Sequence, residues 1–160
     1  MVRCRPDSLR VLVVASVWFL ASGCGGAGLS QADSLHWSVP PLLPPGALIA
    51  VVGGDPTRPG VFTLLVSMPN GYRIPPHSHP SYEHVEVKEG ALLVGAGDRL
   101  DPKMTQALAA GDSATAPAGM HHFSIAKGRT LLSATFMGPY TISYLRAEDA
   151  PKPRSFMIGK

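Results

Sequence analysis

Residues 71–90 read GYRIPPHSHPSYEHVEVKEG and hold three histidines and three glutamates. The cluster stands out because only 16% of the 160 residues are Asp, Glu, Lys or Arg. His77 and His79 are two positions apart, so in a β-strand their side chains share one face. Glu83 returns to that face if residues 80–82 keep the register. The stretch therefore predicts an inward-facing group of two imidazoles and a carboxylate.

The chain around this stretch alternates short strand candidates with turns that contain Gly and Pro. Residues 99–110 form the one interval that could hold a helical turn, and Pro102 limits it. Closely spaced short strands without a long helical period predict an all-β sandwich or barrel. The strand candidates are residues 47–52, 61–68, 84–90, 91–97, 112–119, 121–126, 130–137 and 140–145.

The spacing of this cluster has a counterpart further along the chain. The first string is Gly71, five residues, His77, one, His79, three, Glu83, six, Gly90; the second is Gly111, five residues, Pro117, one, Gly119, two, His122. The two strings resemble the two motifs of the cupin superfamily nearly position for position, and the flanking strand pattern extends the resemblance over residues 61–145. One position departs, because cupins often carry Asn where this chain has Ala126.

The resemblance, to small single-domain bacterial cupins of the RmlC-like type, implies a jelly-roll barrel, also called a double-stranded β-helix. It also implies a metal site inside the barrel made by His77, His79, Glu83 and His122. The donor chemistry agrees, since three imidazoles and one carboxylate suit one divalent transition metal such as Fe, Mn, Zn or Ni. Four protein ligands leave up to two octahedral positions for water or substrate. Ala126 does not occupy a ligand position of the motif, so metal binding should survive the missing Asn.

These side chains also have ordinary structural interpretations. His77 and His79 could be exposed loop residues after Pro75 and Pro76. Glu83 could face solvent, which is the usual position of a glutamate. Each alternative predicts a solvated polar patch in place of a converging set of ligands.

The neighbouring histidines are expected outside the cluster. Adjacent residues in a strand face opposite ways, so only one of His121 and His122 can point inward, and the motif selects His122 unless a bulge exchanges them. His84 and Glu86 alternate with the inward positions and are expected on the outer face. The functional alternative for His84 is a hydrogen bond that supports a metal ligand.

Three further residues are candidates for a ligand pocket. Tyr72 and Arg73 precede the cluster, and a period of two counted back from His77 puts Arg73 on the inner side. Ser124 follows His122 by two positions and is also expected to point inward. No second acid or base stands out, so any catalysis would centre on the metal.

Three functions are compatible with this pattern. The first is an exported metal-binding cupin protein that recognises a small anionic or oxygenated ligand. The second is a metal-dependent enzyme, either an iron-dependent oxygenase of the dioxygenase type or an isomerase. The third is a sensor or partner-binding module with a structural metal. Cupin-like barrels often pair through edge strands, so a homodimer is compatible with the resemblance.

The N-terminal residues have the pattern of a secretory signal peptide. Three arginines precede the apolar run VLVVASVWFL at residues 11–20, which is shorter than the roughly 20 residues of a membrane-spanning helix. The small residues that follow lead into Cys24, an ending that resembles a bacterial lipobox. We therefore expect removal of residues 1–23 and lipidation of Cys24, which predicts a periplasmic or cell-envelope lipoprotein. The alternative is an ordinary signal peptide and a secreted protein.

The remainder divides into a flexible tether at residues 24–36, a barrel at 37–146 and a polar tail at 147–160. Loss of residues 1–23 removes three Arg and one Asp, so 14 basic and 11 acidic side chains become 11 and 10, a net charge of +1. Because no basic cluster with interleaved aromatics remains, nucleic acid is not expected as a partner. The membrane is expected to be contacted only through the lipid anchor.

Overall fold

The computed structural model describes residues 35–152, and the predicted signal peptide, Cys24, the tether up to residue 34 and the tail from residue 153 lie outside the described residues. Within that range, no helix is long and apolar enough to cross a membrane. The elements are β1 (Leu48–Gly53), β2 (Gly60–Met68), β3 (Arg73–Ser78), β4 (Glu83–Ala96), β5 (Gln106–Ala109), β6 (Ser113–Ala116), β7 (His122–Gly138), β8 (Ser143–Tyr144) and the 3-10 turn η2 (Ala147–Asp149). The predicted all-β jelly-roll architecture is confirmed.

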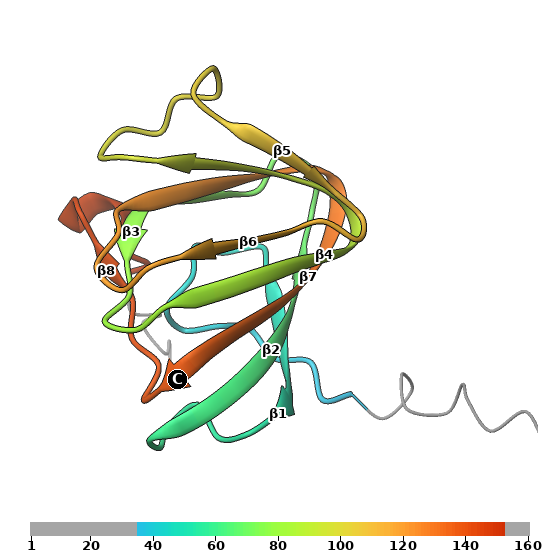
Figure 1. Cartoon of the computed structure of the whole chain (residues 1–160), viewed down its shortest axis with the longest axis vertical. Helices are drawn as coiled ribbons and strands as arrows, with labels where there is room; N and C mark the ends of the chain where they lie inside the picture. The colour runs from blue at the N-terminus through green and yellow to red at the C-terminus, as the bar shows by residue number, and fades with distance from the viewer. Residues whose placement is uncertain (1–34, 153–160) are drawn as a thin grey trace, which may run out of the picture.

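Two long antiparallel strands, β4 and β7, join the two layers of the barrel (Figure 1). Residues 83–89 of β4 pair with residues 131–136 of β7, and residues 91–96 pair with residues 122–127. The first half of β4 and the second half of β7 thereby belong to a layer in the order β1-β2-β7-β4-β6. The second half of β4 and the first half of β7 belong to the other layer, in the order β8-β3-β7-β4-β5. Each long strand crosses from one layer to the other, which closes the barrel around one interior.

Gly90 marks the crossing point in β4. Its φ of 75° lies in the left-handed region, which L-residues with side chains rarely adopt. A Cβ atom there would also overlap the carbonyl oxygen of Arg129 on β7. Only glycine therefore allows β4 to bend while it stays packed against β7.

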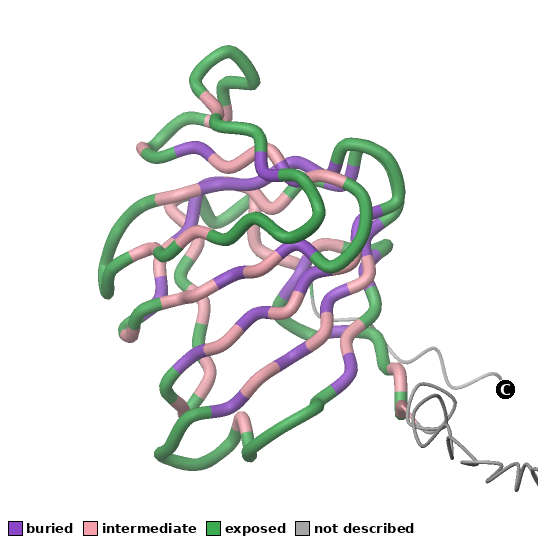
Figure 2. The backbone as a smooth tube through the Cα atoms, turned by 45° about the vertical axis from the view of Figure 1, so that its right-hand side comes forward, coloured by how far each residue is buried: buried purple, intermediate pink, exposed green. Residues whose placement is uncertain are grey.

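The interior is filled by alternate residues of the facing strands, which Figure 2 shows as alternating buried and partly exposed segments. Phe62 of β2 lies opposite Phe136 of β7, and their rings stack with centroids 5.4 Å apart. Further along the same pair of strands, Val66 lies opposite Leu132 and both are buried. Full burial of such a side chain contributes about 1.5–3 kcal/mol, so this ladder is a main source of the barrel's stability.

The two long strands are longer than the sequence pattern predicts. Residues 84–90 and 91–97 were expected to be two strands, as were residues 121–126 and 130–137. Each pair instead belongs to one strand, because the ladder between β4 and β7 continues past its register shifts. The interval 99–110 contains the strand β5 and no helix, and only Ser143–Tyr144 of residues 140–145 form a strand.

Candidate metal centre

The four predicted donors meet where three strands begin or end. His77 lies in β3 opposite His122, the first residue of β7. Glu83 begins β4, and His79 directly follows β3. One ligand atom from each of the four residues lies within 4.8 Å of the others. Two segments about 40 residues apart in the chain thus supply one compact donor set.

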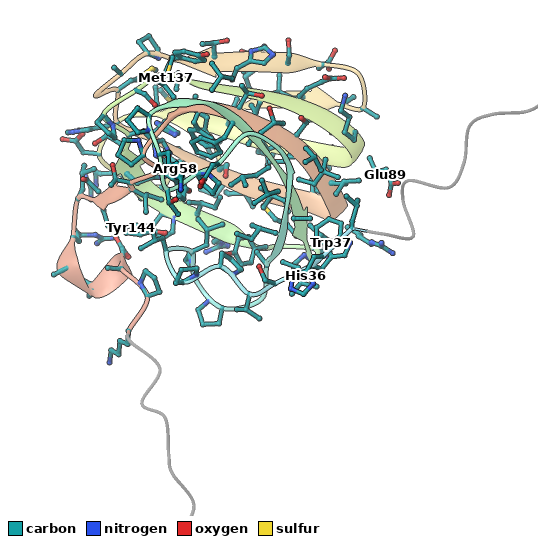
Figure 3. The ribbon with its side chains drawn as sticks, turned by 90° about the horizontal axis from the view of Figure 1, so that it is seen from below. His36, Trp37, Arg58, Glu89, Met137 and Tyr144 are labelled. Carbon is teal, nitrogen blue, oxygen red and sulfur yellow. The ribbon has the colours of Figure 1, made fainter. Side chains whose placement is uncertain are left out.

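This cluster is remote from the bend of β4. Tyr144 of β8 pairs with His77, and the two rings have centroids 5.9 Å apart. Figure 3, a view from below, shows Tyr144 on the opposite side of the barrel from Glu89, which precedes the bend. The bend of β4 and the donor cluster therefore occupy different ends of the molecule.

A backbone carbonyl fixes the orientation of each imidazole. A carbonyl oxygen can only accept, so the Nδ1 atom of each ring donates to it and leaves Nε2 free to bind a cation. Metal-binding histidines usually have this outer hydrogen bond. The pairs are His77 Nδ1 with Pro75 O at 2.8 Å, His79 Nδ1 with Thr141 O at 2.7 Å and His122 Nδ1 with Met120 O at 2.8 Å.

Glu83 faces the Nε2 atoms of the rings. Its Oε2 atom lies 2.8 Å from His122 Nε2 and 3.7 Å from His79 Nε2. The Glu83 side chain is 16% exposed. Because His122 donates from Nδ1 to a carbonyl and from Nε2 to a carboxylate, the cluster without metal contains an imidazolium paired with a carboxylate.

The pKa shifts agree with this charge pattern. Burial, reinforced by the charge of His122, lowers the pKa of His77 to about 3. Burial alone would raise the pKa of Glu83, but the hydrogen bond from His122 and the nearby histidine charges outweigh it and lower that pKa. Burial would likewise lower the pKa of His122, but its bond to Glu83 raises it. The site favours positive charge at the point where the Nε2 atoms meet Glu83.

Two aromatic rings pack against the imidazole of His79. The Phe136 ring meets it edge-on with centroids 5.0 Å apart, and the Tyr140 ring stacks on it at 5.7 Å and 27°. Neither residue belongs to one of the two motifs. Only the alternation of residues 130–137 could have indicated that Phe136 faces inward.

A cavity of about 370 Å³ opens on the other side of the cluster. His77, Glu83 and His122 lie in its wall, whereas His79 does not. Most of the remaining wall is aliphatic, from side chains such as Ile74, Val85, Leu92, Val94 and Leu132. The cavity has the size of a small-molecule pocket with polar groups gathered at one place.

Of the three predicted pocket residues, the structure places one in the cavity wall. Ser124 is buried and lines the cavity. Tyr72 is instead part of the core, and its hydroxyl donates to Pro44 O. Arg73 is exposed and does not line the cavity. The inward placement of Arg73 was wrong because the register of β3 shifts between Ile74 and His77.

The other two histidines near the motifs lie outside the cluster. His84 is hydrogen-bonded through Nδ1 to Thr115 Oγ1 at 2.9 Å, across the β4–β6 pair. His121 Nδ1 lies 2.7 Å from Asp98 Oδ1 at the surface. Both residues are therefore suitable controls for substitutions of the cluster.

The donor set fits a first-row divalent ion. Bonds of about 2.0–2.2 Å from nitrogen and oxygen to such an ion put opposite donors about 4 Å apart. The 4.8 Å spread of the four ligand atoms is close to that value. The three Nε2 atoms and the carboxylate also match the borderline character of Fe, Mn, Zn and Ni.

Comparison with known proteins gives partial matches in sequence. No family model matches the chain. It is 47% identical to Germin-like protein 9-3 of Oryza sativa subsp. japonica over 93 residues, which covers 51% of the chain and 44% of that protein. A second germin-like protein from the same rice is 49% identical over 55 residues, 26% of its length. The chain therefore matches less than half the length of these relatives.

Solved structures establish the fold more broadly. KdgF from Halomonas sp. superposes with a TM-score of 0.54 at 22% identity, covering 68% of this chain and 92% of that one. An RmlC-like cupin from Shewanella frigidimarina NCIMB 400 superposes with a TM-score of 0.53 at 19% identity, covering 74% and 92%. At such identities the likeness concerns the fold alone. With its jelly-roll barrel, both spaced motifs and the clustered donors, this chain has the fold of the cupin proteins to which it is similar.

Proposed function

We propose that this protein holds one divalent transition metal through His77, His79, Glu83 and His122 and binds a small molecule beside it. The observation that carries the proposal is the set of three imidazoles, each fixed through Nδ1 by a backbone carbonyl. Their Nε2 atoms and Glu83 converge within 4.8 Å. Such preorientation lowers the ordering cost of binding an ion.

The chain's own groups would then act as follows. The carbonyls of Pro75, Thr141 and Met120 keep the imidazoles in the neutral, ligating tautomer. Glu83 supplies the one negative charge, which offsets part of the charge of the ion. A bound metal would supply Lewis acidity or redox chemistry at the cavity wall. The aliphatic walls exclude water and orient whatever enters.

An enzyme is the second candidate function, as an iron-dependent oxygenase or another metal-dependent cupin enzyme such as an isomerase. The cavity favours it, since about 370 Å³ of space adjoins three of the four donors. A purely structural metal, as in a sensor or partner-binding module, needs no such space. Iron in the purified protein, with oxygen uptake on addition of a substrate, would identify the oxygenase.

Metal analysis of purified protein that lacks residues 1–23 tests the proposal. We expect about one equivalent of transition metal in the wild type and its loss in His77→Ala and His122→Ala. His84→Ala and His121→Ala are matched controls and should keep the metal. Unchanged metal content in both cluster variants would show that the ion is bound elsewhere, and a metal-free wild type that also takes up none on reconstitution would refute the proposal.

Export and anchoring are part of the proposal and are supported by the sequence pattern of residues 1–24. We propose a periplasmic or envelope lipoprotein attached through Cys24, with secretion as the alternative. Fractionation of cells that express the full chain and Cys24→Ser separates these possibilities. The variant should leave the membrane fraction, and membrane association that persists would contradict the lipid anchor.

A further inference from the structure

We propose that the cavity selects a ligand with one negatively charged oxygen group on an apolar body and rejects dianions of similar size. This inference rests on the proposed metal site and specifies the class of molecule that binds beside it. It follows from the charge of the site, the chemistry of the walls and the size of the cavity.

The charge of the loaded site sets the charge of its ligand. A divalent ion contributes +2, Glu83 contributes −1 and the three neutral imidazoles contribute nothing, which leaves +1. One carboxylate or enolate on the ion neutralises this charge. A second anionic group would leave a net negative charge inside an apolar cavity, where an unpaired charge is costly.

The walls offer no second cation to offset such a charge. Among the residues that the structure describes, the cavity lining contains no Lys or Arg, and Glu83 is its only acidic side chain. Arg73, which the sequence analysis placed in the pocket, is exposed and outside the lining. The metal is therefore the one positive charge that a ligand meets there.

The walls also favour an apolar body. Val85, Leu92, Val94 and Leu132 present aliphatic surface, and Met120 lies in the same wall. Burial of apolar ligand surface against them gains about 25 cal/mol per Å². The volume of about 370 Å³ accommodates a ligand with one aromatic ring.

Ser124 can form a hydrogen bond with the head group of such a ligand. It follows His122 by two residues in β7, so both side chains point to the same face. Ser124 is buried in the cavity wall. Its hydroxyl can donate a hydrogen bond to the oxygen of a carboxylate that the ion does not hold.

Three probe anions test the inference by calorimetric titration of the metal-loaded protein: acetate, benzoate and isophthalate. Benzoate adds an apolar ring to the acetate head group, and isophthalate adds a second carboxylate to the same ring. We expect benzoate to bind roughly tenfold or more tightly than acetate. Isophthalate should bind at least about tenfold more weakly than benzoate. Isophthalate or acetate affinity equal to that of benzoate would overturn the inference.

Two variants separate the contributions of volume and charge without touching the metal ligands. Ala114 of β6 lines the cavity opposite Val85, so Ala114→Leu should weaken benzoate about tenfold and change acetate by less than about twofold. Gln106 of β5 also lines the cavity, opposite Val94. Gln106→Arg should strengthen isophthalate about tenfold relative to the neutral control Gln106→Met. Equal isophthalate affinity in these two Gln106 variants would contradict the charge argument.

Metal content measured on the same samples keeps the two proposals apart. A wild type that binds no metal contradicts the proposed function. A wild type that binds metal through the cluster but shows no preference among the three anions contradicts this inference alone.

Discussion

On one side of the histidine cluster, Phe136 and Tyr140 pack against His79, and the free space there is about 30 Å³. On the other side, a cavity of about 370 Å³ reaches from the cluster past Ser124 to Met104, which is 70% exposed. The packed side is lined by aromatic and aliphatic side chains, whereas the lining of the open side also includes the thioethers of Met104 and Met120 and several small residues.

The two sides of the cluster have different roles, and one surface could not perform both. Rings packed from behind hold an imidazole in place, because close-packed interiors allow little movement. Space in front admits a ligand to the same imidazoles. The four predictions that follow test this division, beginning with the largest expected effect.

Truncation of a side chain should destabilise the protein strongly on the packed side and only weakly on the open side. Phe136 is 3% exposed and stacks on Phe62, so Phe136→Ala should lower the free energy of unfolding by about 3–5 kcal/mol. Met120, 37% exposed at the cavity, is the matched control, and Met120→Ala should cost less than about 1 kcal/mol. Urea denaturation of the metal-free proteins measures both. Similar losses in the two variants would remove the distinction.

Metal removal should lower stability but leave the protein folded. The hydrogen bonds to backbone carbonyls and the aromatic packing hold the imidazoles in place without an ion. The chelated protein should therefore still unfold cooperatively, but at a lower temperature than the metal-loaded protein. Free metal at 100 times its dissociation constant adds about 2.7 kcal/mol to the native state. Calorimetry with and without chelator measures the shift, and His122→Ala should show none. Complete unfolding on chelation would mean that the packed side cannot hold the cluster alone.

Acidification should destabilise the metal-free protein through His77. Its pKa of about 3 in the folded state lies below the usual 6.5, mainly because it is buried. As the pH falls below 6.5 the unfolded chain binds a proton that the folded chain does not, so stability declines. At pH 5 this costs about 2 kcal/mol. Between pH 7 and 5, the free energy of unfolding should therefore fall by about 2 kcal/mol more in the wild type than in His77→Gln, as measured by denaturant titration. Equal decreases in the two proteins would contradict a buried, water-free environment for His77.

The smallest effect is expected at Tyr140, which stacks on His79 without belonging to the donor set. Tyr140→Ala should weaken metal binding about tenfold, the lower end of the range for residues that support ligands. Tyr140→Phe keeps the ring and should bind metal within about twofold of wild type. Competition with a chromophoric chelator measures both affinities. If the two variants behave alike, the ring does not position His79.

Side-chain placement follows from the sequence where a local rule applies. The period of two in strands puts His77 and His79 on one face, and both are buried beside Glu83. It failed for Arg73, because Pro75 and Pro76 lack the N–H groups that continue a ladder, and the register shifts there. After that shift, Ile74 and His77 both line the cavity although they are three residues apart.

The strand boundaries failed for a related reason. Glycine at positions 90 and 128 usually marks a turn, and both residues have positive φ. In this barrel the partner strand continues past each glycine, so the strand bends where it was expected to end. Whether a glycine ends a strand or bends it depends on the neighbouring strand, which the local sequence does not specify.

The sequence alone therefore determined the all-β class, the resemblance to cupins and the four donors, because strand alternation and motif spacing are local properties. The tertiary structure decided what surrounds those donors. Thr141 O and the Tyr140 ring reach His79 from about 60 residues away, and the cavity wall draws on five strands. Such contacts depend on how the barrel closes, and this closure follows from the packing of the whole chain.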